Sequence, residues 1–218
     1  MLGALWSFQG RYRTLHLTWI AFFLTFVVWF NLAPLATTVK ADLGLTVGQI
    51  RTVAICNVAL TIPARVLIGM LLDKFGPRIT YSSILVFSAI PCLLFASAQD
   101  FNQLVVARLL LSIVGAGFVI GIRMVAEWFP PKEIGLAEGI YGGWGNFGSA
   151  FSALTMVALA GFLSFSGGFE LPTGAFLNWR GAIALTGIIS AVYGLCYFFN
   201  VTDTCLLYTS PSPRDLRK

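Results

Sequence analysis

The chain has 218 residues, of which 57% are hydrophobic and only 11% charged, and its mean hydropathy is +0.83. This composition leaves too little polar surface to cover a water-soluble globule, so it excludes a soluble domain and predicts a protein embedded in the lipid bilayer. The formal net charge is +5, but the basic residues are scattered between hydrophobic stretches, which argues against a nucleic-acid-binding face.

Six hydrophobic stretches of about 20 residues predict membrane-spanning helices, and none alternates with the period of two that barrel strands show. In chain order they cover residues 16–36, 52–72, 79–98, 103–129, 138–162 and 181–201. The joints between them are short and polar, apart from a longer loop at 164–180. Short joints make neighbouring helices antiparallel, so the predicted fold class is all-α, with six helices in one membrane bundle and no second soluble domain.

Basic residues near the ends of these stretches predict a cytoplasmic N-terminus. The first stretch is too long for a cleavable signal and lacks a small-residue cleavage pattern. We therefore expect a cytoplasmic segment at 1–15, the bundle at 16–203 and a tail at 204–218. In this orientation the cytoplasmic side holds Arg11, Arg13, Lys74, Arg78, Arg123 and Lys132, while Lys40, Arg51, Arg108 and Arg180 lie outside or near the outer end.

Arg65 lies near the middle of the second stretch, where an arginine costs about 2.5 to 3.5 kcal/mol on insertion scales. We therefore expect its charge to be needed. A guanidinium presents paired donors and suits a small oxyanion. Asn146 in the fifth stretch and Phe118 in the fourth fall at a similar predicted depth, where an amide can add a neutral donor and a ring can exclude water.

Each of these three residues also has a structural interpretation. Arg65 can pair with helix carbonyls or face a water-filled crevice, Asn146 can bridge two helices, and Phe118 can pack against lipid or core. Around Asn146, small residues recur at helical spacing and predict a flat seam for another backbone or a small ligand. The seam contains Gly135, Gly139, Gly142, Asn146, Ser149 and Ala153.

The joint after the second stretch reads Gly69-Met70-Leu71-Leu72-Asp73-Lys74-Phe75-Gly76-Pro77-Arg78. It resembles the cytoplasmic signature of the major facilitator superfamily, G-x-x-x-D-[RK]-x-G-x-[RK]-[RK], with Ile79 departing at the last position. Glycine and proline make the turn, and the charges can latch neighbouring helices or can simply be solvated. The candidate latch residues are Gly69, Asp73, Lys74, Gly76, Arg78 and, at i and i+4 on the fourth stretch, Arg123 and Glu127.

Within that superfamily the chain resembles the nitrate/nitrite porters over about residues 10 to 203. The resemblance rests on Phe26 to Leu35, Pro63-Ala64-Arg65, Glu127 to Pro131, and the glycine-rich Gly142 to Gly148. It implies that Arg65 is the substrate-binding arginine, that Phe118 packs on the bound anion, and that Asn146 and Gly142 belong to the nitrate signature. It also implies twelve helices in two halves, with the missing C-terminal half supplying a second arginine.

The sequence therefore predicts transport of nitrate, or of nitrite, across the plasma membrane. No acidic residue falls at mid-depth, so we expect no carboxylate proton relay in this half, and exchange for nitrite and proton symport both stay open. The alternatives are transport of a small organic anion and a six-helix assembly protein that does not transport. A single histidine, His16, and four cysteines without metal-ligand spacing predict no metal, no cofactor and no enzymatic chemistry.

The tail from about Cys205 onward contains Ser-Pro repeats that cannot form a helix. It resembles translated sequencing-adapter read-through, so we expect residues 204–218 to be non-native; a native, disordered cytoplasmic tail is the alternative.

Overall fold

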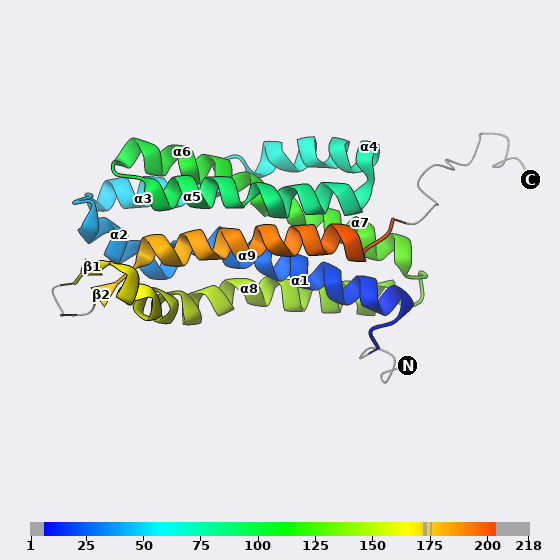
Figure 1. Ribbon diagram of the computed structural model, residues 1–218. Coiled ribbons are helices and arrows are strands. Elements are labelled where there is room, and N and C mark those ends of the chain that lie inside the picture. Colours follow the sequence, from blue (N-terminus) through cyan, green and yellow to red (C-terminus); the bar gives the residue numbers. More distant parts are fainter. Residues whose placement is uncertain (1–6, 172–173, 175, 204–218) are drawn as a thin grey trace, which may run out of the picture.

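The helices run roughly along one axis and pack side by side (Figure 1). The structure is a computed structural model that describes residues 7–171, 174 and 176–203, so the predicted tail lies outside the described residues. Its elements, in chain order, are α1 (Gly10–Phe30), η2 (Ala33–Leu35), α2 (Ala36–Asp42), α3 (Val47–Ala59), α4 (Thr61–Phe87), α5 (Ala89–Ser97), α6 (Phe101–Ser112), η3 (Ile113–Ala116), α7 (Gly117–Trp128), α8 (Ile134–Phe162), η4 (Leu163–Ser166), β1 (Phe169–Glu170), β2 (Phe176–Leu177) and α9 (Trp179–Asn200).

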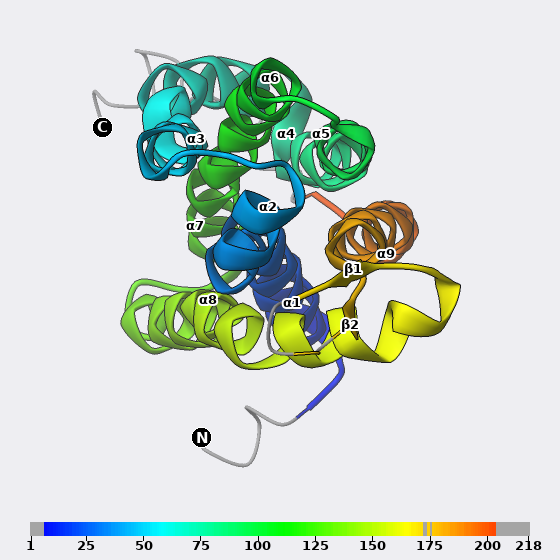
Figure 2. The same ribbon diagram turned by 90° about the vertical axis from the view of Figure 1, so that its left-hand side faces the viewer.

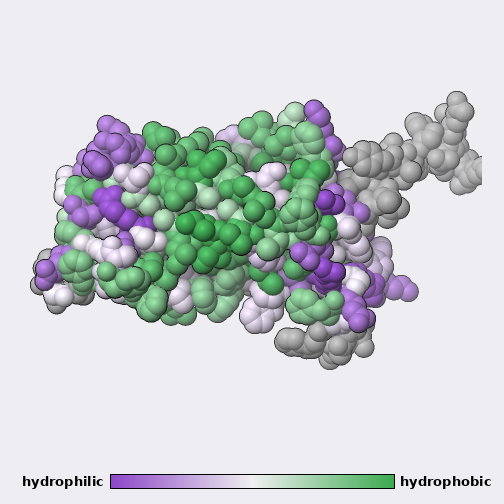
Figure 3. Space-filling model, viewed as in Figure 1, coloured by the Kyte–Doolittle hydropathy of each residue, from purple (hydrophilic) through white to green (hydrophobic). Residues whose placement is uncertain are grey.

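Five helical runs among the described residues are long and apolar enough to cross a membrane. Hydrophobic residues cover the middle of the molecule and hydrophilic residues gather at its two ends, as a bilayer requires (Figure 3). The sequence predicted six such helices, and the count differs because two predicted helices fall in one run of 51 residues. The runs are Gly10–Asp42, Val47–Ser97, Phe101–Trp128, Ile134–Ser166 and Trp179–Asn200.

The 51-residue run is interrupted inside α4 by Gly76, whose φ of 78° and ψ of 165° are not helical. Only glycine occupies this backbone region readily, because a Cβ would clash with the neighbouring peptide. Pro77 follows, with its fixed φ and missing N–H suited to the first residue of a new helix. The predicted joint at 73–78 is therefore a one-residue break, at which Figure 1 shows the chain turning back.

Side-chain caps begin α3, α6 and α9 at the same end of the molecule, which we call the capped end. Thr46 and Gln49 form a reciprocal capping box at the start of α3. Asp100 accepts the N–H of Gln103 at the start of α6. Asn178 caps α9 in the same manner, so each helix has a polar residue that satisfies its first free N–H groups. Between α8 and α9, the predicted loop at 164–180 includes η4 and the two-stranded hairpin β1–β2.

Several helices are interrupted part-way along, whereas α8 and α9 are continuous over 29 and 22 residues. Prolines follow three of the interruptions, where their missing N–H groups fall at or near a helix start and cost little. The interruptions lie at residues 31–32, at Leu60, at Ser88 and through η3, and the prolines are Pro34, Pro63 and Pro91. The segments α3, α5 and α6 therefore occupy the capped end as separate short helices.

Helix α1 lies in the centre of the bundle, with its longest contact against α8 (Figure 2). That contact is close because Gly145 and Gly148 carry no side chain where Phe22 and the backbone of Phe23 approach. Helix α7 packs between α4 and α8 along one side of the molecule, and α5 and α9 lie on the other side. Helix α1 begins at Gly10, six residues before the predicted start, and Gly10 itself has a left-handed φ of 53°.

Candidate substrate-binding face

The three predicted site residues lie on three adjacent helices, α4, α7 and α8. Arg65 is exposed on α4 and makes no hydrogen bond or ion pair with any residue that the structure describes. Asn146 is exposed on α8, where its Nδ2 donates to the carbonyl of Gly142 at 2.7 Å. Phe118 is half-buried on α7. No hydrogen bond joins any two of the three.

The side-chain amide of Asn146 donates a hydrogen bond within its own helix, so among the described residues it does not bridge two helices. Asn146 is exposed, however, and its side-chain oxygen Oδ1 accepts no hydrogen bond from a described residue. An amide donor bound to a carbonyl four residues earlier can exchange that bond for one to a ligand at little cost. The side chain is thus accessible for binding without further rearrangement of the fold.

The ring of Phe118 is held by two other aromatic rings. It stacks on Tyr141 of α8 with 6.4 Å between centroids and an interplanar angle of 19°, and it lies 5.4 Å from Phe22 of α1. The hydroxyl of Tyr141 donates to the carbonyl of Phe118 at 3.0 Å. These contacts agree with the interpretation that Phe118 packs in the core. Because the ring is only half-buried, part of its surface stays exposed.

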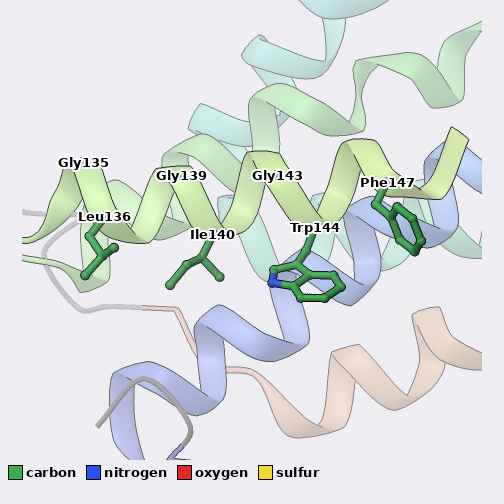
Figure 4. A pocket seen from close by; sticks show the side chains of 7 residues that line it. All are labelled: Gly135, Leu136, Gly139, Ile140, Gly143, Trp144 and Phe147. Atoms are coloured by element: carbon green, nitrogen blue, oxygen red, sulfur yellow. The ribbon is translucent and has the colours of Figure 1, made fainter. Parts of the chain in front are cut away.

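The glycines of α8 lie on two faces of the helix, and those of the predicted seam lie on the open face. Gly145 and Gly148 face α1, whereas a Cβ added at Gly135, Gly139 or Gly142 would meet nothing within 4 Å. Beside the open glycines is a hollow of ≈ 630 Å³, and Figure 4 shows its large side chains on one side of α8. The hollow is lined by Gly135, Leu136, Gly139, Ile140, Gly143, Trp144 and Phe147, which suit an apolar partner better than an anion.

Three of the predicted latch residues make ion pairs at the end of the molecule opposite the capped end. Arg123 Nη1 lies 3.3 Å from Asp73 Oδ1, and Arg123 Nε lies 2.6 Å from Glu127 Oε1. The first pair is largely in water, with 40% of the Arg123 side chain and 72% of the Asp73 side chain exposed. Lys74 lies over the ring of Phe75, and Gly69 has open space where a Cβ would be.

Arg78 does not join this cluster but contacts the segment after α9. Its backbone N–H donates to Asp203 Oδ1 at 2.9 Å, and its guanidinium lies over the ring of Phe198. Asp203 also lies against Gly76, where a Cβ would be 3.0 Å from its Oδ2. Burial raises the pKa of Asp203, although Arg78 opposes the rise. Sequence patterns missed Asp203 because its partners are more than 120 residues earlier in the chain.

Arg108, which we expect to lie outside or near the outer end, is fully buried among α1, α3, α5 and α6. Its Nη2 donates to Asn31 Oδ1 at 2.8 Å, and its Nη1 donates to Asn57 Oδ1 at 3.2 Å. Charge patterning indicates on which side of the bilayer a basic residue lies but not whether its side chain is solvated. The presence of two asparagines within other apolar stretches was the available signal for a buried polar site.

Comparisons with known proteins agree on the family. The profile of the Major Facilitator Superfamily matches residues 18–215. The nitrate/nitrite transporter NrtP of Picosynechococcus sp. is 61% identical over the whole chain, and NrtP of Nostoc punctiforme is 62% identical over 94% of it. The chain spans 43% and 40% of the lengths of these two relatives.

A solved structure shows the same fold. A bacterial homologue of the human lysosomal transporter Spinster, in an inward-facing conformation, matches with a TM-score of 0.72 at 20% identity. The match covers 93% of this chain and 45% of that chain.

Proposed function

Because the chain belongs to the Major Facilitator Superfamily, we propose that it is the six-helix N-terminal half of a twelve-helix transporter. The break at Gly76 supports this count, because it divides the run Val47–Ser97 into two passes that are each long enough to cross about 30 Å of hydrocarbon. The chain spans less than half of its NrtP relatives, which leaves room for a second bundle of similar size. Alternating access by rocking of two bundles requires both.

The proposed cargo is nitrate, with nitrite as a related substrate, carried across the plasma membrane with the N-terminus in the cytoplasm. The observation that carries the proposal is Arg65, an exposed cation without a protein partner among the described residues, in an apolar part of α4. Two relatives of the chain are named nitrate/nitrite transporters, which supports a small oxyanion as the partner of the Arg65 guanidinium. These relatives are transporters rather than enzymes.

In this proposal the substrate lies between the two halves. Arg65 binds the anion through paired N–H donors, and Asn146 adds a neutral donor beside Gly142. The free edge of Phe118 limits the cavity on the α7 side, and the second half supplies the other cation. The cluster of Asp73, Arg123 and Glu127 latches one conformational state. The division into a segment at 1–15, a bundle at 16–203 and a foreign tail stays a prediction.

The test is nitrate uptake by the full-length transporter carrying Arg65→Lys or Arg65→Gln. Lysine keeps the charge but loses the planar fork, so we expect uptake to fall by about tenfold or more, and glutamine to abolish it. Arg51→Lys is the matched control, because Arg51 is exposed near the start of α3 and outside the proposed site. Normal uptake by Arg65→Lys would refute bidentate recognition of the anion.

A small organic carboxylate is the second candidate cargo, favoured by the apolar hollow on α8, which offers room for a carbon skeleton. Competition separates the two: excess unlabelled nitrate suppresses uptake of labelled nitrate if the first proposal is right, and acetate or lactate in the same excess does not.

A further inference from the structure

Arg108 is a buried cation that the proposed transport mechanism leaves without a role. It is fully buried, and its described hydrogen-bond partners are two neutral side chains, Asn31 and Asn57. Its guanidinium carbon lies 4.2 Å from the centroid of the Phe95 ring. No carboxylate among the described residues pairs with it, and its Nε has no partner there. Burying such a charge costs free energy, so we expect the buried arginine to hold its neighbours in a specific geometry.

Both asparagines are themselves held in place. Asn31 Nδ2 donates to the hydroxyl of Thr186 in α9 at 3.0 Å. Asn57 Nδ2 donates to the carbonyl of Trp29 at 2.9 Å, and the Trp29 indole N–H donates back to the carbonyl of Asn57 at 2.6 Å. A buried network with its amides satisfied on both sides is rigid. Arg108 therefore fixes the capped-end helices α3 and α6 to α1 and α9.

Helix α6 holds the α3–α4 junction at two successive turns. One turn is held by Arg108 through Asn57, and the next by Ser112, four residues along α6. The backbone N–H of Leu60, the residue between the two helices, donates to Ser112 Oγ at 3.3 Å. Thr61 Oγ1, at the first residue of α4, donates to the carbonyl of Ser112 at 3.2 Å. Both sides of the junction are thus bound to α6.

Arg65 lies one helical turn beyond Thr61, so the angle at Leu60 determines where its guanidinium lies. We propose that Arg108 is a positioning residue for Arg65: by holding Asn57 it fixes the α3–α4 junction and so the approach of Arg65 to the anion. The inference rests on the proposed function of Arg65. A planar fork that must match a planar ion tolerates little displacement, because errors near 1 Å can cost about a hundredfold in rate.

The experiment measures KM and kcat for nitrate in liposomes containing the full-length transporter. It compares the parent with Arg108→Met, Asn57→Ala and the double variant. We expect each single change to raise KM about tenfold with kcat within about twofold, because a displaced Arg65 weakens anion binding. The double variant should be no worse than the worse single variant, because both changes break the same contact. Arg108→Lys should recover part of the loss, since an ammonium can still bond one asparagine.

Ser190→Ala is the matched control, because Ser190 makes a buried hydrogen bond to Ser88 that does not touch the α3–α4 junction. We expect its KM to equal that of the parent. The proposal is overturned if Arg108→Met leaves KM unchanged, if the double variant shows the product of the single effects, or if Ser190→Ala raises KM equally. Should Arg108→Met fail to fold, Asn57→Ala decides, since it leaves Arg108 bound to Asn31, and an unchanged KM there overturns the proposal.

Failure of this inference can be told from failure of the proposed function. Normal nitrate uptake by Arg65→Lys overturns the proposed function and the positioning role with it. Impaired uptake by Arg65→Lys together with an unchanged KM in Asn57→Ala overturns the positioning role alone.

Discussion

Gly145 of α8 lies so close to the ring of Phe22 in α1 that a Cβ added to the glycine would overlap the ring. Phe22 is fully buried, so the ring cannot move aside without disturbing its neighbours. We therefore expect Gly145→Ala to lower the free energy of unfolding by about 1 to 3 kcal/mol. Thermal unfolding of the chain in detergent measures the change. Gly139→Ala is the control, expected to be neutral or stabilising because its Cβ meets nothing within 4 Å. Equal melting temperatures for the two variants would contradict the prediction.

The carboxylate of Asp203 caps the helix that begins after Gly76 by accepting the N–H of Arg78. Asp203→Ala removes this acceptor, so we expect a loss of about 1 kcal/mol in stability, as for other helix caps. Asp203→Asn keeps an oxygen in the same place and should retain most of the stability. Chemical denaturation in detergent distinguishes them. A parent-like Asp203→Ala variant would show that the cap contributes nothing.

The same residue predicts a pH dependence. Because burial raises the pKa of Asp203, the folded state binds its proton more tightly than the unfolded state does. The stabilisation from that proton is complete at low pH, below the ordinary pKa of an aspartate, and is lost as the pH rises through the higher folded-state pKa. Melting temperatures of the parent and Asp203→Asn, compared between about pH 4 and pH 7, should differ in slope, with the parent losing more stability. Parallel curves would contradict this.

Arg123 pairs with Glu127, whose side chain is 10% exposed, and with Asp73 in a largely water-exposed ion pair of the kind that usually contributes about 1 kcal/mol or less to stability. We expect Arg123→Ala to melt close to the parent but to reduce the kcat of uptake by the full-length transporter about fivefold. The physical reason is that 1 kcal/mol is enough to shift the balance between two conformational states by that factor. Lys132→Ala is the control, because Lys132 is exposed, makes no ion pair with a described residue and is not a candidate latch residue. A parent-like kcat in Arg123→Ala would remove the latch role.

The predicted membrane segments follow from hydropathy because burial in lipid acts on each stretch separately. The charge cluster at Asp73, Arg123 and Glu127 could also be predicted, since Arg123 and Glu127 are at i and i+4 and the second and fourth stretches end on the same predicted side of the membrane. What these patterns share is that a local feature of the sequence, the spacing on one helix or a charge at the end of a stretch, indicates the residues.

Arg108 and Asp203 were not predictable in the same way. The partners of Arg108 are 77 and 51 residues away, and they are neutral, so no charge pattern indicates them. The sequence also did not indicate which glycines of α8 face another helix. Gly139 and Gly145 are six residues apart, which turns them about 240° around the helix, so one faces open space while the other faces α1. Only the packing of α1 reveals which face is occupied.

The cap supplied by Asp203 has a consequence for synthesis of the chain. Arg78 emerges from the ribosome 125 residues before the carboxylate that accepts its backbone N–H. Throughout that interval the hairpin made by α4 lacks its cap and part of its packing, since α9 also contacts α4 and α5. The turn at Gly76 therefore acquires its cap only after translation has passed residue 203, and a ribosome stalled within α8 would leave the Arg78 N–H without this acceptor.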